Sequence, residues 1–564
     1  MSSSSDIYVM ENSLNDNLQD TSTVYFNDKN YVFITDSTSN SGSFTSGMIQ
    51  FDLSSLASQS SRISFQDGIV EFPVKVNATV DVAATGTTAN TTAGIHAAII
   101  KNGWHQFIDT AQLIIDGQTI QSAQPYENVA ATFRILSSWS QDTLQKWGSS
   151  CGITLDDCTA DTQATLSNTI GLSNATFSTM ATSIKGFDVV NNQSLVYNKG
   201  IPARASITNN DVITATATQL SILGNSSMKN LGKGVVEYLA GGTNTAGASF
   251  FTAYYMATVR IRDLFDINDL PLMKNLKGFL YLTFNSTKTS LSMSTAGALS
   301  SVSYNTLTGR TNPILINIQT TGINSGSGST LGPTIGVSAT VDGTTSGSLS
   351  TKAGPLLVNA RLLVPAYSCN PKTDEALSNP SKFFTTLEKI IVPITVTAGG
   401  TVSYTITTGV PNPRRLTIHG MWQNLGGATL PNPEVSAFET VPATTGPFMA
   451  LQNFQVYLAN KPLYQYPITY TFEQWLSENS DVGLNGNVVN EDTSGLLSQK
   501  LFEQNHAIYT VNLSKRTIAD DGASKSVQVN FTNPSAAYGM KAVAIVWYEK
   551  QWVMNTDLCK ISQV

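Results

Sequence analysis

Strict alternation of apolar and polar residues is the feature that most constrains the fold of this chain. Val70, Phe72, Val74 and Val76 occupy every second position, and the stretch 358–364 repeats the pattern. A period of two points side chains alternately to the two faces of a strand, so that one face can be buried. Stretches of helical period are rare. We therefore predict an all-β fold with a few short helices.

The composition indicates a globular chain that covers much of its surface. The 564 residues allow roughly two to four domains of ordinary size. Hydrophobic residues make up 41% of the chain, which excludes a disordered protein. Charged residues make up only 13%, about half the usual share. Burial in an assembly, or extended uncharged β surface, would account for so little charge.

The charge balance argues against packaging of nucleic acid by a basic tail. The net charge is −7, and neither end carries a cluster of Lys and Arg. Neutralising phosphates requires clustered cations. Arg414 and Arg415 follow a proline turn and could touch nucleic acid, but a solvated or interface position is favoured.

Metal binding and membrane insertion find no support in the motifs. Cys151, Cys158, Cys369 and Cys559 lack metal-ligand spacing, so free and mostly buried thiols are expected. The acidic pairs at 156–157 and 520–521 match no calcium loop, and we predict no metal and no cofactor. No signal peptide is visible. The longest apolar run, 542–548, is too short to span a membrane and is typical of a buried strand.

One hairpin pattern occurs twice. Leu113 and Ile115 precede Asp116-Gly117, and Ile120 follows. In the second copy the corresponding residues are Val456, Leu458, Ala459-Asn460 and Leu463. Two-residue turns are common in hairpins, so this repeat is a hypothesis: two copies of one β fold in tandem. A further hairpin is expected at 392–406, around a glycine turn.

Three helices can be placed. Ser138 with Gln141 resembles a capping box, and that helix should end at Gly148. Thr471 with Gln474 forms a similar box after the second hairpin. A third short helix is expected within 259–275. The tryptophans of the first two helices, Trp139, Trp147 and Trp475, could form a carbohydrate platform, but packing on a sandwich edge is favoured.

Gly/Ser/Thr-rich segments at 322–336 and 342–354 divide the chain. We predict an N-terminal arm at 1–50, a first unit at 51–350 with a loop insertion at about 156–249, and a second unit at 351–564. The glycine-rich stretch 326–332 lacks the Lys-Ser/Thr ending of a phosphate-binding loop. The scattered histidines, His96, His105, His419 and His506, favour structural or surface positions, and no catalytic residue is predicted.

The stretch 259–285 resembles the double jelly-roll major capsid proteins of polinton-like viruses and virophages. In that family a strand leads into a helix and then a second strand, and the matching residues are Arg260, Asp263, Leu264, Asp266, Leu270, Pro271, Leu272, Lys277, Gly278, Leu282, Thr283 and Asn285. Segments 101–121, 395–420, 451–478 and 542–564 resemble the same family, in the same order. The resemblance runs from about residue 65 onward and is faint in the insertion and the Gly/Ser-rich middle.

The resemblance implies two tandem eight-stranded jelly-roll sandwiches. It further implies a structural protein of a small double-stranded DNA virus, whose homotrimers form pseudo-hexagonal capsomers of an icosahedral shell. Penton or minor capsid proteins would be partners, without sequence-specific binding of nucleic acid or a membrane span. The protein would belong to the virion, be assembled inside the host cell and catalyse no reaction. The arm at 1–47 would face inward or run under neighbouring trimers.

Two other functions fit an all-β chain rich in Ser, Thr and Asn. One is a secreted β-sandwich protein that binds glycans or acts as an adhesin, and it predicts a stable monomer. The other is a glycan-cleaving enzyme, which needs two carboxylates facing each other across a cleft.

Overall fold

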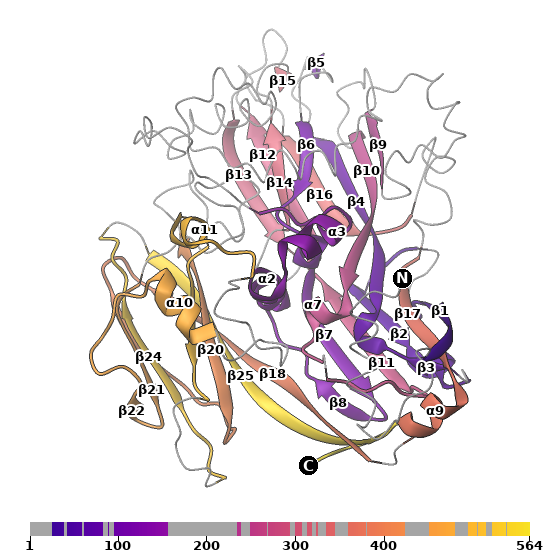
Figure 1. The fold of residues 1–564 in the computed structure, drawn as a ribbon. Helices are drawn as coiled ribbons and strands as arrows, with labels where there is room; N and C mark the ends of the chain where they lie inside the picture. The colour runs from indigo at the N-terminus through magenta and orange to yellow at the C-terminus, as the bar shows by residue number, and fades with distance from the viewer. Residues whose placement is uncertain are drawn as a thin grey trace.

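The computed structural model describes residues 25–38, 42–44, 46–58, 61–82, 88–89, 95–155, 234–238, 249–267, 269–293, 299–306, 313–318, 323–324, 334–344, 359–378, 381–423, 451–479, 495–504, 506–514, 522–536 and 539–564. Almost all of these residues lie in two β-sandwiches and the short helices between them (Figure 1). The prediction of an all-β fold is confirmed.

The first sandwich contains two four-stranded layers. One layer has the order β1 (Phe26–Thr35), β17 (Arg361–Cys369), β4 (Ile69–Val82) and β10 (Ser249–Arg260). The other has the order β2 (Met48–Asp52), β11 (Gly278–Phe284), β7 (Ile108–Ile115) and β8 (Gln118–Gln121). If these strands are numbered one to eight along the chain, the layers read 1-8-3-6 and 2-7-4-5.

The second sandwich repeats this order strand by strand. One layer contains β18 (Lys382–Val396), β25 (Gly539–Asn555), β20 (Pro413–Gln423) and β23 (Ile508–Asn512). The other contains β19 (Thr401–Ile406), β24 (Val527–Thr532), β21 (Gln452–Leu458) and β22 (Lys461–Pro462). These layers again read 1-8-3-6 and 2-7-4-5, the order of a jelly roll. The chain is a double jelly roll.

The repeated hairpin occupies the same place in both sandwiches. It forms strands four and five, which are β7–β8 in the first and β21–β22 in the second. Both turn residues have positive φ in each copy, 50° and 76° at Asp116-Gly117 and 47° and 66° at Ala459-Asn460. Such turns match the right-handed twist of the strands they join. The predicted tandem repeat is therefore confirmed.

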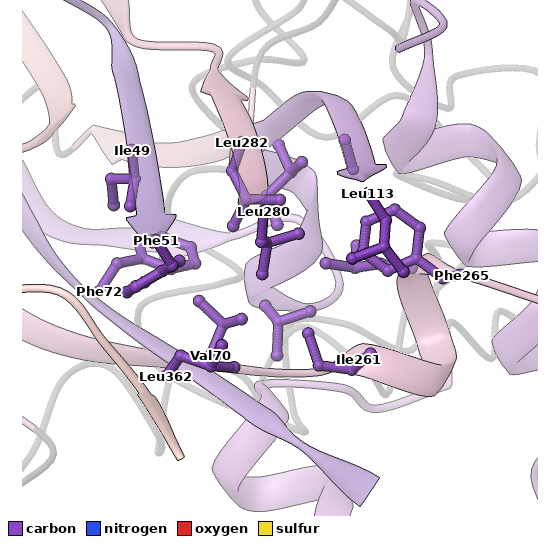
Figure 2. Packing of buried hydrophobic residues seen from close by; sticks show 14 of the residues in the cluster. Ile49, Phe51, Val70, Phe72, Leu113, Ile261, Phe265, Leu280, Leu282 and Leu362 are labelled. Carbon is purple, nitrogen blue, oxygen red and sulfur yellow. The ribbon is translucent and has the colours of Figure 1, made fainter. Parts of the chain in front are cut away.

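The core of the first sandwich follows from the alternation. Val70, Phe72, Val74 and Val76 on β4 are 3% exposed or less. They face residues of the opposite layer, including Ile49, Phe51, Leu280 and Leu282 (Figure 2). The run 542–548 lies in β25, between β18 and β20, as the prediction of a buried strand requires.

Additional strands extend one end of the first sandwich (Figure 1). β16 (Thr334–Val341) pairs with β4, and β12 (Thr287–Met293) and β13 (Leu299–Thr306) continue that sheet. On the other side, β9 (Gly234–Tyr238) pairs with β10. Two small ribbons complete this end: β6 (Ile95–Ile100) with β14 (Ile314–Ile318), and β5 (Thr88–Ala89) with β15 (Ile323–Asn324). The predicted loop insertion at 156–249 lies outside the described residues, except for β9 and the start of β10.

The strand pairing shifts both predicted unit boundaries. β1, within the predicted arm at 1–50, pairs with β17, which fell in the predicted second unit at 351–564. The reason is topological, because the first and last strands of a jelly roll are neighbours in one layer. The chain passes to the second sandwich at α9 (Pro371–Leu377), after the Gly/Ser-rich segments. Of the predicted arm, residues 1–24 lie outside the described part.

The glycine turn at 392–406 is present, but the predicted hairpin is wrong. β18 pairs with β25 and β19 pairs with β24, so the two consecutive strands belong to opposite layers. Gly399 has φ 63° where the chain turns from one layer to the other. Alternation identified both strands, but local sequence carries no information on which strands pair across the sandwich.

The helices differ in detail from the prediction. α2 (Glu127–Ser138) was not expected, and Ser138 ends it. α3 (Gln141–Cys151) is capped by Ser140, whose hydroxyl accepts from the backbone N–H of Thr143, and it ends at Gly152. The predicted Ser138 cap and Gly148 end are therefore wrong.

The remaining helices are short. α10 (Phe472–Asn479) begins directly after Thr471, as predicted. Among the described residues of 259–275, only α7 (Ile261–Leu264) is α-helical. α11 (Gln499–Gln504) packs near α10 in the second sandwich.

Candidate functional site: the seam between the two sandwiches

α2 lies between the two sandwiches and belongs to both cores (Figure 1). It follows β8 of the first sandwich, and every residue from Glu127 to Ser137 is buried. Ala131 packs in the core of the first sandwich, whereas Val129, Ala130, Phe133 and Leu136 pack in the core of the second. A helix that is buried on all sides serves as a shared core element.

The second sandwich in turn contributes side chains to the core of the first. β18 and β25 pair along their full common length, from Lys382 opposite Met554 to Val396 opposite Met540. One end of this long ladder leaves the second sandwich and enters the core of the first, together with the residues that follow β25. The residues concerned are Phe384, Trp552, Met554, Cys559 and Ile561. Each sandwich thus completes the core of the other.

Trp547 on β25 marks the centre of the seam. Its side chain is fully buried, and its indole N–H donates to Thr417 Oγ1 at 3.1 Å. From α2, the Phe133 ring lies 6.2 Å from the Trp547 ring, and the Arg134 guanidinium lies 4.9 Å from the ring centre. A large aromatic in contact with a shared helix and with its own sheet fixes their relative position.

A buried ionic network crosses the seam beside Trp547. Glu127 Oε1 lies 3.2 Å from Arg134 Nη1, and Glu127 Oε2 pairs with Lys389 Nζ on β18. All three side chains are 2% exposed or less. Arg134 Nη1 also donates to the carbonyl of Leu264, at 2.5 Å. The network therefore joins α2, α7 and β18, and removal of one member would leave a buried charge unpaired.

Asp266, directly after α7, is enclosed by cations from both sandwiches. Burial raises the pKa of its carboxyl group to about 7, although Arg134, Arg415 and Lys389 act in the opposite direction. Within the described residues, Asp266 Oδ2 accepts no hydrogen bond, so the buried charge is poorly compensated. Burial likewise lowers the pKa of Lys389 to about 8 and that of Arg415 to about 10.

A second ionic cluster fastens the ends of the second sandwich to the first. Arg62 on β3 (Arg62–Ile63) is fully buried. Its Nε lies 2.7 Å from Asp374 Oδ1 on α9, and its Nη2 lies 2.9 Å from Asp557 Oδ1 after β25. Lys274 Nζ reaches Asp374 Oδ2 at 2.6 Å. One arginine thus holds both the connecting helix and the turn that precedes β26 (Lys560–Gln563).

The motif behind the family resemblance contributes to this seam. Asp263 Oδ1 accepts from the indole N–H of Trp139 at 2.9 Å, and Asp263 Oδ2 pairs with Arg260 at 3.6 Å. The Arg260 guanidinium lies 5.2 Å from the ring centre of Trp139 and 5.5 Å from that of Trp147. Trp139 and Trp475 are 2% exposed or less. These tryptophans pack the helices against the sandwiches, and a platform of exposed rings for carbohydrate is not formed by them.

Three of the histidines singled out by sequence, His105, His419 and His506, are buried. Burial lowers the pKa of His105 and of His419 to about 3, so both rings are neutral at pH 7. His506 is fully buried, and His96 lies in β6. His105 Nε2 lies 2.9 Å from Thr132 Oγ1 on α2.

The paired arginines, for which a solvated or interface position was favoured, differ in exposure. Arg415 is 1% exposed, and Arg414 forms an ion pair with Glu549 on β25. Cys151 and Cys559 are buried, as predicted, and Cys369 is half-buried. Cys158, the acidic pairs at 156–157 and 520–521, and the stretch 326–332 lie outside the described residues.

The described part of the chain contains neither a metal-binding cluster of side chains nor a membrane-spanning helix. No three or more His, Cys, Asp or Glu side chains gather there in a way that could hold a metal ion. In the same residues, no helix is both long and apolar enough to cross a membrane.

Sequence reasoning missed the seam itself. Its central element, α2, carries Glu127 and Arg134 on one face, about two turns apart, and is otherwise rich in small and apolar residues. A helical stretch with only two charged residues and few other polar ones is typical of a buried helix, and this pattern could have predicted α2.

Comparisons with known proteins gave results for structure only. No family model matches the sequence, and no curated protein matches it. Among solved structures, the chain is similar to the mavirus major capsid protein, with 10% identity, a TM-score of 0.47, and coverage of 98% of this chain and 93% of that chain. It is also similar to a chain of the Sputnik virophage (12% identity, TM-score 0.47, coverage 98% and 91%) and to the Faustovirus major capsid protein (11%, 0.42, 96% and 93%).

Proposed function

We propose that this chain is the major capsid protein of a small double-stranded DNA virus. The observation that carries the proposal is the pair of jelly rolls with one strand order, locked into a single block by exchange of core residues. Three such blocks around a three-fold axis supply six similar wedges, which is what a pseudo-hexagonal capsomer requires. These capsomers would tile an icosahedral shell around the genome.

The surface of the block supports this function. Large apolar side chains are exposed in the described residues, on the edge strand β1 (Tyr31, Phe33), on β18 (Phe383) and elsewhere (Tyr404, Tyr466, Leu558, Val564). Within the described sheets, β1 and β8 are terminal strands, and a neighbouring subunit would protect such edges from uncontrolled pairing. The small share of charged residues, 13%, suits interfaces whose centres are depleted in charge.

The remaining features of the proposal follow from a structural role. The protein resides in the virion after assembly inside the host cell, with penton or minor capsid proteins as partners. Its function is self-association, without catalysis and without sequence-specific recognition of the genome. Of the arm at 1–47, β1 is a strand of the first sandwich, and residues 1–24 lie outside the described part.

Light scattering combined with negative-stain imaging tests the function directly. The expected result is a particle of three times 60.3 kDa with a pseudo-hexagonal outline, or closed shells. A stable monomer without particles at any salt concentration or pH would overturn the proposal. That result would favour a glycan-binding protein, to be tested next with a sugar screen.

A further inference from the structure

The segment 552–564, here named the clasp, belongs to the second sandwich by pairing and to the first by packing. Its strand β26 pairs with the end of β25, from Trp552 opposite Gln563 to Asn555 opposite Lys560. Its apolar side chains point into the first sandwich, where Trp552, Met554, Cys559 and Ile561 are 5% exposed or less. The first sandwich therefore has an incomplete core until the clasp is in place.

Polar contacts fix the clasp to three parts of the first sandwich. The loop before β11 donates twice, from Lys274 N to Thr556 O at 2.8 Å and from Asn275 Nδ2 to Asp557 O at 2.6 Å. The Asp116 carboxylate, in the turn of the β7–β8 hairpin, accepts from Ile561 N at 3.3 Å. Arg62 on β3 holds Asp557, as described above. These hydrogen bonds and this ion pair hold the clasp in one position, in addition to the burial of its apolar side chains.

The position of the clasp along β25 makes its placement depend on the second sandwich. β25 pairs with β20 over residues 539–548 and with β18 over residues 540–554. When β25 is held between these two strands, its C-terminal end beyond residue 548 projects toward the first sandwich. A single strand thus links completion of one core to completion of the other.

We propose that the clasp is a built-in checkpoint: it closes last, and its closing both finishes the first sandwich and makes the block competent to assemble. All strands of the first sandwich precede the clasp in the chain, so they leave the ribosome before it. Until it closes, the pocket for its four apolar side chains stays open, and such a cavity destabilises a core. The link to assembly rests on the proposed capsid function, whereas the order of closing does not.

Cys559 provides a reporter for clasp closure in the unmodified full-length chain. Its side chain is 1% exposed, and burial raises the pKa of the thiol to about 11, so the closed clasp should react slowly with a thiol reagent. The chain would be refolded from denaturant, pulsed with N-ethylmaleimide and analysed by peptide mass spectrometry. Amide hydrogen exchange of β7 and β11 would be followed in parallel.

The expected order is that β7 and β11 gain full protection no earlier than Cys559 stops reacting, and after the β20–β25 ladder is protected. Full protection of β7 and β11 while Cys559 still reacts would overturn the proposal. Protection of the clasp before the β20–β25 ladder would overturn it as well.

A matched pair of variants tests the same point at equilibrium. Ile561→Asp places a charge at a buried clasp position, and Ser562→Asp places the same charge at the exposed neighbouring residue. We expect at least tenfold faster exchange of β7 and β11 in Ile561→Asp, little change in β21 and β24, and neither effect in Ser562→Asp. Equal loss of protection in both sandwiches, or none in either, would contradict the proposal.

Assembly is read separately from these measurements. Ser562→Asp should form particles and Ile561→Asp should not. If the wild type forms no particles, the capsid function fails, while the order of clasp closure is still decided by labelling and exchange.

Discussion

The two sandwiches share one strand order but differ in how they use it. In the described residues the second is close to the minimum, with the eight jelly-roll strands, the short strand β26 and two short helices. The first carries extra strands on β4 and β10, a shared helix between its strands, and a core that is completed by the clasp. The shared topology determines which strands pair in each sandwich. The side chains determine whether a sandwich fills its own core or needs residues from the other.

The largest expected effect comes from removing the aromatic that both sandwiches touch. Trp547→Ala should lower the free energy of unfolding by about 3–5 kcal/mol, because a fully buried indole is replaced by a cavity. Since Phe133 and Arg134 of α2 contact this ring, both sandwiches should lose stability together. Urea unfolding with hydrogen exchange resolved by strand measures the effect.

The control for this prediction is Phe383→Ala, at a side chain that is 76% exposed, which should change the isolated chain little. Separate unfolding transitions, with only the second sandwich weakened by Trp547→Ala, would show that the seam does not couple the two.

A second test compares equivalent positions at the start of strand seven. Gly278 on β11 lies opposite Ile115, and Val527 on β24 lies opposite Leu458. Gly278 has φ +151°, and an added Cβ would lie 2.0 Å from the carbonyl oxygen of Ile114. Gly278→Ala should therefore cost about 3 kcal/mol through strain and displacement of β7. Val527→Ala should cost about 2 kcal/mol, from lost burial alone.

The two costs can be told apart by structure as well as size. Thermal unfolding gives the stabilities, and amide exchange at β7–β8 should change only in Gly278→Ala. Wild-type stability in Gly278→Ala would mean that β7 and β11 can separate without loss, contrary to their close pairing.

The parts of the fold that sequence predicted are those set by local rules. Alternation identified β4 and β17, the apolar run 542–548 identified β25, and the repeated turn identified strands four and five in both sandwiches. The error at β18 and β19 has the opposite origin, because a turn between two strands looks the same whether they pair or cross to opposite layers. The boundaries failed for a similar reason, since β1 and β17 are far apart in sequence and adjacent in space.

The seam could be predicted only in part. The motif residues Arg260, Asp263 and Asp266 were recognised from the family resemblance, but their partners were not. Arg134, Trp139 and Arg415 come from α2, its C-terminal boundary and β20, and only the fold brings them near the motif. Clustering of charges from distant strands has no sequence signature, so pairs such as Glu127 with Lys389 needed the structure.

The pH dependence of the seam gives a third effect, which develops over several pH units. The pKa of Asp266 is raised from 3.8 to about 7 by burial, so the folded chain favours the protonated form. The resulting stabilisation is fully present below pH 4 and is lost as the pH rises through 7. Each unit of raised pKa corresponds to about 1.4 kcal/mol.

Asp266→Asn mimics the protonated carboxyl group at every pH. Relative to wild type, the variant should gain stability from pH 5 to pH 8, measured as the difference in urea midpoints. Asp142→Asn, at an exposed ion pair on α3, should show no such trend. Parallel curves for wild type and Asp266→Asn would mean that Asp266 ionises without a burial penalty in this seam.

The smallest effect concerns the two hairpin turns, which use different residues for one geometry. Ala459 has φ 47°, a left-handed conformation that costs an alanine about 1 kcal/mol. Ala459→Gly should therefore stabilise the chain by about 0.5–1 kcal/mol, since glycine adopts this conformation freely. Gly117→Ala makes the reverse change in the first sandwich, where a Cβ would meet nothing within 4 Å. It should destabilise the chain by about 1 kcal/mol through backbone conformation alone.

Because each change adds or removes one methyl group at an exposed or half-buried turn, this pair reports mainly the local backbone effect. Thermal unfolding of the two variants and their double combination measures both changes, which should add because the turns lie in different sandwiches. A non-additive result would show that the two hairpins are energetically coupled through the seam. The coupling would then extend from α2 and the clasp to the β7–β8 and β21–β22 hairpins.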